Sequence, residues 1–231
     1  MDAYWTANGF LFDIGISTRM AIRNLRVGVP PESSGCKKET ENGNGSLMRI
    51  LPLLFHIADR PIDERFNLTQ QVSAITHGHI RSVIACFYYL EFARQILDGK
   101  DKFEIYKNLQ TEITDYLTGI SIDPKEIAIF DRLLKNDIDK LSEEKINSSG
   151  YVLETLEASI WCLLTTGTYS EAVLKAVNLG NDTDTTAAVA GGLAGLLYGI
   201  DAIPEKWIKQ LARYEDINDL AERLAEKKSI K

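Results

Sequence analysis

The segment NLGNDTDTTAAVAGGLAGLLYG, residues 178–199, decides the fold. Two aspartates and three threonines precede a run made almost entirely of alanine and glycine. A helix that needed only stability would avoid this composition, because each glycine costs roughly 1 kcal/mol relative to alanine. Small residues do, however, allow neighbouring helices to approach closely. The segment therefore predicts a tightly packed helix with a polar start, whose small face is formed by Ala187, Ala190, Gly191, Ala194 and Gly195.

Helical periodicity continues through most of the chain. Apolar residues recur at the spacing of an amphipathic helix in residues 153–164, and two further stripes lie on either side of Gly78. Period-2 strands and internal repeats are not evident. We predict an all-α fold in a single domain over residues 1–231, a length that suffices for one substantial core. Similar helical stripes cover residues 102–117, 124–135, 169–179, 204–213 and 216–227.

The composition excludes several classes of protein. A net charge of −7 disfavours attraction to nucleic acid or to an anionic membrane, and no apolar run approaches the ~20 residues of a spanning helix. The first ten residues carry no basic region and no long apolar core, unlike a signal peptide. Cys36, Cys86 and Cys162 are odd in number and widely spaced, which favours reduced thiols over disulfides. We expect a cytoplasmic protein that binds neither nucleic acid nor membrane.

Two polar segments interrupt the helical pattern. Residues 28–45 are rich in proline, glycine, serine and charge, and residues 142–150 form a polar connector. Each segment could link two domains. In a chain of this length we interpret both as surface loops of one domain, and the first is long enough to carry function.

The polar start of residues 178–199 allows two interpretations. Aspartate and threonine are favoured at helix N-termini, where their oxygens cap free backbone N–H groups and acids complement the helix dipole. Carboxylate and hydroxyl oxygens also suit Mg²⁺ or Mn²⁺, and alternate residues at a helix start can converge on one ion. Asp182, Thr183, Asp184 and Thr185 lie at this point of the pattern.

The segment ENGNGSLMRILPLLF, residues 41–55, leads from a glycine loop into an apolar stretch predicted to become helical near Leu47. Free backbone N–H groups at such a start can cradle an anion, because glycine lets a phosphate approach the main chain. A flexible loop with Ser46 as the N-cap explains the same residues. The segment is not a P-loop, since G-K-[ST] is lacking, and no strand precedes it as in a Rossmann turn.

The segment ITHGH, residues 75–79, places His77 and His79 on either side of Gly78 at a break in the helical pattern. A helix C-terminus with Gly78 at the C′ position explains most of this arrangement. Two histidines without a third ligand make a poor zinc site, so the functional alternative is a hydrogen-bond donor in an active site.

The segment LFDIGISTRMA, residues 11–21, places Asp13 on a glycine turn just before a helix that is predicted to start at Ser17 or Thr18. An aspartate commonly forms such turns with its own side chain. An acid at this position could equally face a ligand.

In this order the motifs resemble those of one family, the ADP-ribosylglycohydrolases. Residues 12–21 are similar to the family's D-x-G-x-x-T turn, residues 42–53 to its G-N-G-x-x-M-R-x-x-P element, and residues 75–79 to its T-H element. The longest match covers residues 154–199, which are similar to the family's final signature almost throughout. The resemblance runs from about residue 5 to residue 207.

The resemblance implies an orthogonal all-α fold and a binuclear magnesium, sometimes manganese, site that uses water to cleave a glycosidic bond to ADP-ribose. The substrate would be an ADP-ribosylated protein or a small molecule that contains ADP-ribose. Asp13 matches a position close to the scissile sugar, so Asp13 and Asp184 are the expected catalytic residues. The expected metal ligands are Asp182, Asp184 and Thr185. The residues expected to hold diphosphate and ribose are Gly43, Asn44, Gly45, Ser46 and His77.

The chain also departs from the family. A T-D-D-T motif supplies the other half of the metal ligands in family members, and no T-D-D-T occurs in this sequence. Two Mg²⁺ ions bring four positive charges, whereas Asp182 and Asp184 bring two negative ones. We therefore expect one ion rather than a pair, unless an N-terminal segment in trans or another copy adds carboxylates. Apolar helix faces that such a segment would cover are expected to be exposed, which favours a homo-oligomer.

Three functions are compatible with these motifs. The first is metal-dependent hydrolysis of a glycosidic bond to ADP-ribose. The second is binding of ADP-ribose or a related nucleotide without turnover. The third is a structural or partner-binding role that retains only the fold. The intact metal and glycine-loop motifs favour ligand binding over a purely structural role, and the absence of T-D-D-T favours binding over efficient catalysis.

Overall fold

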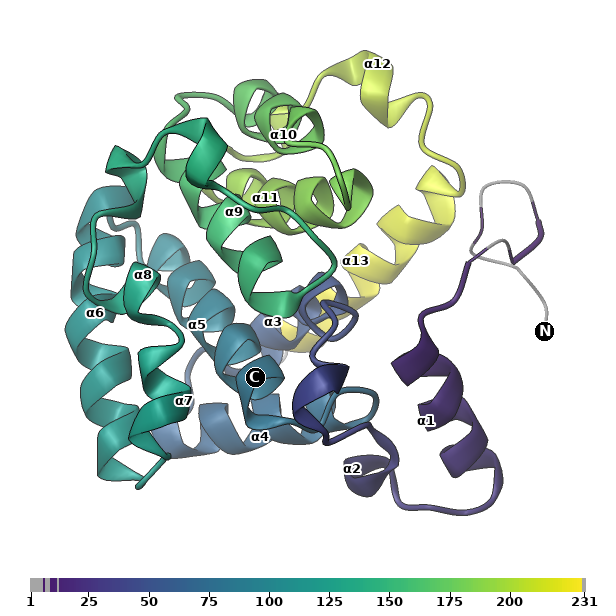
Figure 1. Cartoon of the computed structure of the whole chain (residues 1–231). Helices are drawn as coiled ribbons and strands as arrows, with labels where there is room; N and C mark the ends of the chain where they lie inside the picture. The colour runs from purple at the N-terminus through teal and green to yellow at the C-terminus, as the bar shows by residue number, and fades with distance from the viewer. Residues whose placement is uncertain (1–5, 7–8, 12, 230–231) are drawn as a thin grey trace.

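A computed structural model of the chain describes residues 6, 9–11 and 13–229, with the backbone alone for residues 228 and 229. The described residues form helices and turns without strands, apart from isolated bridges between Cys36 and His77 and between Gly43 and Tyr151. The helices cross at steep angles, so the predicted orthogonal all-α fold is confirmed (Figure 1). None of the described helices is both long and apolar enough to cross a bilayer.

The α-helices follow one another with short connections, many of which contain a 3₁₀ turn. The helices are α1 (Ile16–Arg26), α2 (Pro31–Ser34), α3 (Leu54–Ile57), α4 (Ile62–Ala74), α5 (Ile80–Leu97), α6 (Lys102–Gly119), α7 (Pro124–Ala128), α8 (Asp131–Leu134), α9 (Val152–Leu164), α10 (Tyr169–Asn178), α11 (Thr183–Tyr198), α12 (Glu205–Ile208) and α13 (Tyr214–Ser229). The 3₁₀ turns are η1 (Glu39–Glu41), η2 (Leu47–Arg49), η3 (Leu51–Leu53), η4 (Ile138–Lys140), η5 (Glu143–Lys145) and η6 (Ile200–Ala202).

Helix α5 lies at the centre of the core and packs against α4, α6, α9 and α11. Its sequence is apolar on nearly every side, as expected of a helix surrounded by protein. The Nδ1 atom of His79 caps its start by accepting a hydrogen bond from the Arg81 N–H at 3.2 Å. Gly99, with φ of +77°, turns the chain away at its end.

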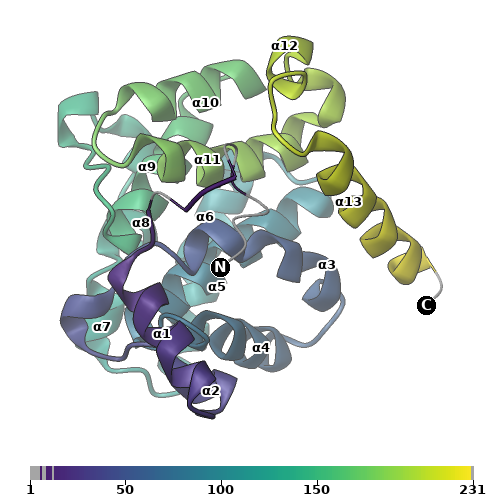
Figure 2. The same cartoon turned by 90° about the vertical axis from the view of Figure 1, so that its right-hand side faces the viewer.

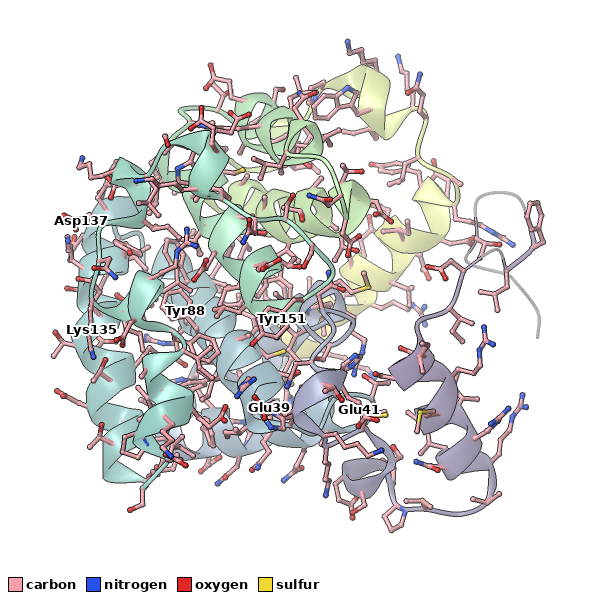
Figure 3. All side chains as sticks on the ribbon, in the orientation of Figure 1. Glu39, Glu41, Tyr88, Lys135, Asp137 and Tyr151 are labelled. Atoms are coloured by element: carbon pink, nitrogen blue, oxygen red, sulfur yellow. The ribbon has the colours of Figure 1, made fainter. Side chains whose placement is uncertain are left out.

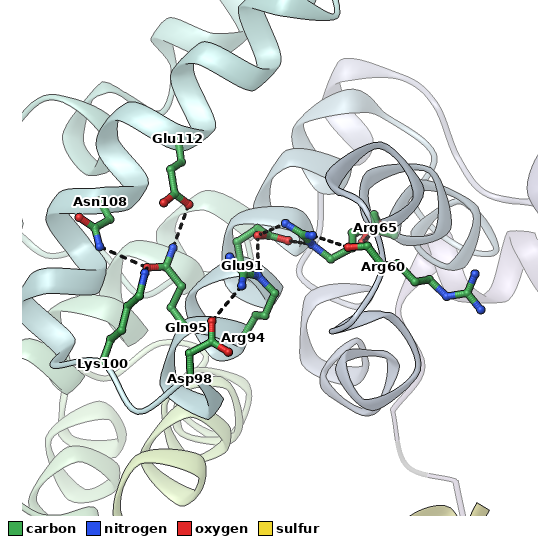
Figure 4. Close-up of polar contacts among 10 residues, drawn as sticks. Arg60, Arg65, Glu91, Arg94, Gln95, Asp98, Lys100, Asn108 and Glu112 are labelled. Carbon is green, nitrogen blue, oxygen red and sulfur yellow. Dashed lines mark hydrogen bonds and ion pairs between the residues drawn. The ribbon is translucent and has the colours of Figure 1, made fainter. Parts of the chain in front are cut away.

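A buried ion pair joins α4 to α5 (Figure 4). The Nε and NH2 atoms of Arg65 donate to the two carboxylate oxygens of Glu91 at 2.6 and 2.7 Å, and Arg94 Nε donates to Glu91 as well. Paired, bidentate geometry of this kind compensates the desolvation of both charges. The pair sets the position of α4, whose end leads directly to His77.

Three predicted helices are interrupted. Residues 124–135 are divided between α7 and α8, and only α12 forms within residues 204–213. After Leu47 the chain makes η2 and η3 before the short α3. Pro52 explains this last break, because in a continuous α-helix its ring would clash with the carbonyl of Met48 and remove a hydrogen bond.

The prediction that Gly78 ends a helix at the C′ position is wrong. Helix α4 ends at Ala74, and Gly78 is not among the glycines with positive φ. The Gly78 N–H instead donates to the carbonyl of Cys36 at 2.7 Å, within the short bridge that pairs residues 35–36 with 76–77. The glycine that this pairing requires is Gly35, where a Cβ would lie 2.2 Å from the carbonyl oxygen of Ala74.

Helix α11 is packed closely by α9, α10 and α5, as its composition predicts. The tightest contact is at Gly192, outside the predicted small face, where a Cβ would lie 2.5 Å from the hydroxyl of Tyr89 and 2.8 Å from Leu51 Cδ2. At Gly191 and Gly195 the nearest atoms would be 3.4 and 3.9 Å away, which is ordinary contact. The polar start of α11 therefore stands on a helix that is held against the core.

The two terminal helices lie at the edge of the molecule. Helix α1 packs mainly against α2, and α13 projects from the body (Figure 2). Apolar side chains are exposed on both, including Ile16, Met20 and Val27 on or beside α1 and Leu220 on α13.

Candidate functional site

The side chain of Asn44 joins the glycine loop to two distant helices. Its Nδ2 atom donates to Thr155 Oγ1 of α9 at 2.8 Å and to Asp182 Oδ2, just before α11, at 2.7 Å. Asn44 is 7% exposed, so both contacts are shielded from water. One amide therefore brings together the two motifs that the sequence singled out, which lie 138 residues apart along the chain.

The segment of residues 142–150 forms the back of this arrangement. The carbonyl of Ser148 accepts from the Asp182 N–H at 3.0 Å, and the carbonyl of Gly150 accepts from the Asn44 N–H at 3.0 Å. Tyr151, which follows at the start of α9, bridges to Gly43 and lies above the segment that carries Glu39 and Glu41 (Figure 3). The polar connector is thus packed against both motifs.

The Asp182 carboxylate does not cap α11. Asp182 occupies the N-cap position, but its side chain makes no capping hydrogen bond and is held by Asn44 instead. Asp184 lies in the first turn and is exposed, whereas Thr185 is buried. The Asp182 side chain therefore links the glycine loop to α11 instead of capping the helix.

The glycine loop has unused backbone donors. Among the described residues, the N–H groups of Gly45 and Ser46 make no hydrogen bond with the protein. Ser46 occupies the N-cap position of η2, but its backbone is helical (φ −80°, ψ −38°) and its fully buried side chain makes no capping hydrogen bond. Its hydroxyl instead lies 3.5 Å from Cys86 Sγ. Free N–H groups beside glycine are the features of an anion cradle.

His77 lies directly against this loop. A Cβ on Gly45 would be 2.8 Å from its Cε1 atom, and a Cβ on Gly43 would be 3.4 Å from its Nε2 atom. His77 is 3% exposed, and no described residue forms a hydrogen bond with Nε2. Glycine at position 45 thus makes room for the imidazole ring, whose Nε2 edge faces the loop at Gly43.

Burial, together with a smaller contribution from the positive charge of Arg49, lowers the pKa of His77 from 6.5 to about 4. The imidazole is therefore neutral at physiological pH. Its Nδ1 atom is 2.8 Å from Thr76 Oγ1, which also accepts a hydrogen bond from Arg49 NH2 at 2.7 Å.

The first motif reaches the loop through a residue other than the predicted one. Asp13 is exposed and precedes α1, whereas Thr18 on α1 lies against the loop, with its Oγ1 atom 3.7 Å from the Cβ position of Gly45. Asp13 is thus near the site in sequence but is not brought into contact with Asp182 or Asp184. Within residues 6, 9–11 and 13–229, no group of three or more His, Cys, Asp or Glu side chains is placed to hold a metal ion.

The donors at the start of α11 fit one hard cation by their chemistry. Asp182, Asp184 and Thr185 provide two carboxylates and a hydroxyl, which are oxygen ligands of the kind that Mg²⁺ and Mn²⁺ prefer. Two divalent ions would carry twice the charge that the two carboxylates neutralise. By charge, these residues would therefore suit one ion rather than two.

Besides Thr18, three residues of the site were not predicted as site residues. Thr155 carries no recognisable signal, because a threonine inside an apolar helix is typical of ordinary structure. Thr76 and Arg49 belong to the T-H and M-R elements quoted from the sequence. Each was therefore visible as part of a motif, Thr76 next to His77 and Arg49 shortly after the glycine loop. Their contact with one another was not.

An open cavity of about 760 Å³ lies away from these residues, between the start of α6, the end of α9 and one side of α10. Its two lysines are already engaged by the protein. Lys102 Nζ donates to the Leu163 carbonyl at 2.8 Å, and Lys175 Nζ donates to Thr165 Oγ1 at 2.7 Å. Both close the C-terminal end of α9, where cations are stabilised by the helix dipole. We assign this cavity no part in the site.

Comparison with known proteins agrees with the motifs. The sequence profile of the ADP-ribosylglycohydrolase family matches residues 2–230. The chain is 33% identical, over 95% of its length and 55% of the relative's, to the ADP-ribosylarginine hydrolase Tri1 of Pseudomonas putida strain GB-1. It is 30% identical, over 86% of its length and 60% of the relative's, to the ADP-ribosyl-[dinitrogen reductase] glycohydrolase of Rhodospirillum rubrum.

A solved structure described as an ADP-ribosylglycohydrolase-related protein complex has the same fold, with a TM-score of 0.75 and 29% identity over 91% of this chain and 68% of that one. The chain spans a little more than half the length of the two enzymes named above. The profile match over nearly the whole sequence shows that this chain belongs to the ADP-ribosylglycohydrolase family.

Proposed function

We propose that this protein hydrolyses a glycosidic bond to ADP-ribose with the help of Mg²⁺ or Mn²⁺, and that its substrate is an ADP-ribosylated arginine side chain. The observation that carries the proposal is the hydrogen bond from Asn44 Nδ2 to Asp182 Oδ2 at 2.7 Å. It joins a loop with free backbone donors, which suit a diphosphate, to the Asp182 carboxylate at the start of α11, where Asp184 follows two residues later.

The glycine loop would bind the diphosphate. The N–H groups of Gly45 and Ser46 make no hydrogen bond with the described residues, and glycine allows phosphate oxygens to approach them. The neutral His77 adds a ring nitrogen at the same edge. A loop without side chains at residues 43 and 45 would thus accept the ligand directly on the backbone.

The carboxylates would act at the sugar. Cleavage of the bond to the anomeric carbon develops positive charge on the ribose, which nearby carboxylates stabilise. Asp184, exposed in the first turn of α11, and Asp13, exposed before α1, are the two acids that we propose for this role. Asp182, held by Asn44, would stay in one orientation and keep the start of α11 in register with the loop.

A cation bound by Asp182, Asp184 and Thr185 would orient the ribose hydroxyls and lower the pKa of a bound water. The two carboxylates support one ion. A second ion would need carboxylates from another segment or from a second copy of the chain, and the exposed apolar residues of α1 and α13 offer surface for such contacts.

The arginine linkage rests on relatives. A hydrolase named for ADP-ribosylarginine is similar over 95% of this chain, as is a second Tri1 protein from Serratia proteamaculans strain 568 at 29% identity.

The three cysteines are free, which favours a reducing compartment such as the cytoplasm.

A second function is supported by one observation. The described part of the chain gathers no third His, Cys, Asp or Glu side chain beside Asp182 and Asp184 to hold a metal ion. A site with that limited charge favours binding of ADP-ribose without turnover.

Calorimetric titration of ADP-ribose tests the binding step, with Mg²⁺, with Mn²⁺ and with a chelator. We expect binding that requires the metal, with about one ion per chain. Release of ADP-ribose from ADP-ribosylarginine, followed by chromatography, then separates hydrolysis from binding alone.

Asp184→Asn should abolish the metal-dependent part of binding, because it removes one of two charges that face the ion. Asp201→Asn, an exposed aspartate in η6, is the matched control and should bind normally. Metal-independent binding, or unchanged binding by Asp184→Asn, would contradict the metal assignment.

A further inference from the structure

A line of hydrogen bonds connects Arg49 to the ring of His77. Arg49 NH2 donates to Thr76 Oγ1 at 2.7 Å and to the Val72 carbonyl at 3.2 Å, and Thr76 Oγ1 lies 2.8 Å from His77 Nδ1. The line joins the η2 turn, directly after the glycine loop, to the segment that follows α4. His77 is therefore held from the side opposite the loop.

The positions of the hydrogens along this line follow from counting donors and acceptors. An arginine can only donate, so it occupies a lone pair of the Thr76 oxygen. The single hydroxyl hydrogen of Thr76 has one acceptor among its described partners, the Nδ1 atom of His77. A hydrogen on Nδ1 would leave that buried hydroxyl without an acceptor, which is costly.

A neutral imidazole that accepts at Nδ1 carries its hydrogen on Nε2. The Nε2 atom is the one that faces the glycine loop, 3.4 Å from the Cβ position of Gly43. A protonated ring is disfavoured by burial and by the charge of Arg49, which together bring the pKa of His77 to about 4. Only the donor form of Nε2 is then presented to the loop.

We propose that Arg49 and Thr76 are positioning residues that hold His77 in the Nε2–H form, so that it donates to an anionic oxygen of a ligand bound at residues 43–46. This proposal deepens the proposed function and rests on it for the identity of the ligand. The tautomer itself is a property of the free protein. The guanidinium acts on the ring through Thr76, because its NH2 group donates to Thr76 Oγ1 and to the Val72 carbonyl of α4.

Nitrogen NMR of protein labelled with ¹⁵N-histidine tests the tautomer. The chain has three histidines, and the His77→Gln variant assigns the signals of His77. We expect an acceptor-type shift at Nδ1 and an N–H-type shift at Nε2 at pH 7. Donor-type shifts at Nδ1 in the wild-type protein would overturn the proposal, whatever the variants do.

Thr76→Val and Thr76→Ser separate orientation from packing. Valine removes the hydroxyl, so both tautomers should be populated, and affinity for ADP-ribose should fall in proportion to the lost Nε2–H fraction, about twofold for equal populations. Serine retains the hydroxyl and should restore the Nε2–H form. Equal spectra for the valine variant and the wild type would overturn the proposal.

Arg49→Met and Ser73→Ala complete the set. Loss of the positive charge at position 49 should raise the pKa of His77 and loosen the tautomer preference. Ser73 Oγ donates to the His77 carbonyl at 2.8 Å without contacting the ring, so Ser73→Ala should lower stability and leave the tautomer unchanged. A change of tautomer in Ser73→Ala would mean that packing alone orients the ring.

The two proposals fail in different ways. A wild-type protein with the Nε2–H form but no affinity for ADP-ribose would remove the ligand from this inference and contradict the proposed function. A protein that binds ADP-ribose with the hydrogen on Nδ1 would contradict this inference alone.

Discussion

At the scale of single residues, Asn44 carries the contact between the two halves of the site. Its Nδ2 atom has two hydrogens, and each is used, one by Thr155 on α9 and one by Asp182 before α11. Its backbone N–H is used as well, by the Gly150 carbonyl. A buried amide with all of these donors satisfied has little freedom to move, so the orientation of the Asp182 carboxylate depends on it.

We expect Asn44→Ala to lower the free energy of unfolding by about 1–3 kcal/mol, because the buried partners lose their donors. It should also weaken ADP-ribose binding, since Asp182 would no longer be held against the loop. Urea denaturation and calorimetry measure the two effects. Asn218→Ala is the control, since Asn218 also donates to a carboxylate, that of Glu222, but on the exposed α13. Equal effects of the two variants would show that the Asn44 contact has no special role.

At the scale of elements, the packing of α11 decides where its polar start lies. The hydroxyl of Tyr89, on α5, donates to the Val189 carbonyl at 2.9 Å and occupies the space beside Gly192. At Gly195, one turn further along, the atom nearest to the Cβ position is 3.9 Å away, which is an ordinary contact distance. Close packing thus requires glycine at residue 192, whereas residue 195 has room for a larger side chain.

We expect Gly192→Ala and Gly195→Ala to change stability in opposite directions. Alanine at residue 192 would overlap Tyr89 and Leu51, and overpacking of this kind costs about 1–3 kcal/mol, more than the helix propensity gained. Alanine at residue 195 meets no such overlap and should stabilise the protein by about 0.5–1 kcal/mol. Thermal denaturation distinguishes the two, and stabilisation by Gly192→Ala would refute the close approach.

At the scale of the whole molecule, stability should depend on a buried acid in α9. Glu157 is 4% exposed, and desolvation raises its pKa from 4.5 to about 7, although Arg132 Nε lies 3.3 Å from its Oε2 atom. Its Oε1 atom has no hydrogen-bond partner among the described residues. The ionised form is therefore less favourable in the folded than in the unfolded chain.

The sign of the pH dependence follows from this raised pKa. Between pH 4.5 and about 7 the folded protein holds a proton on Glu157 that the unfolded chain has lost, so its contribution to stability is present below pH 4.5 and is lost as the pH rises to about 7. The loss is on the order of 3 kcal/mol, from about 1.4 kcal/mol per pKa unit.

Glu157→Gln keeps the shape of the neutral acid and cannot ionise. We expect the variant to match the wild type near pH 4.5 and to become the more stable of the two as the pH approaches 8, measured by urea denaturation across this range. Glu104→Gln, at an exposed site on α6, should show no such trend. A difference between wild type and Glu157→Gln that is independent of pH would contradict the raised pKa.

The sequence by itself determined the class of fold and the chemical character of the site. Apolar periodicity predicts α5, α6, α9, α10 and α13. A helix that packs against a core buries one face or all of its surface, so apolar residues recur every three or four positions along its sequence. The polar start of α11 and the glycine loop were visible for a related reason, since unusual residue types interrupt the pattern there.

Only the tertiary structure decided which of these residues meet. Asn44 and Asp182 are 138 residues apart, and no local pattern records a hydrogen bond between them. The same holds for Gly78, which by its local sequence ends a helix but whose N–H pairs with Cys36 from another segment. Local propensity contributes about 1 kcal/mol or less per residue, so it yields wherever burial and hydrogen bonds between distant segments contribute more.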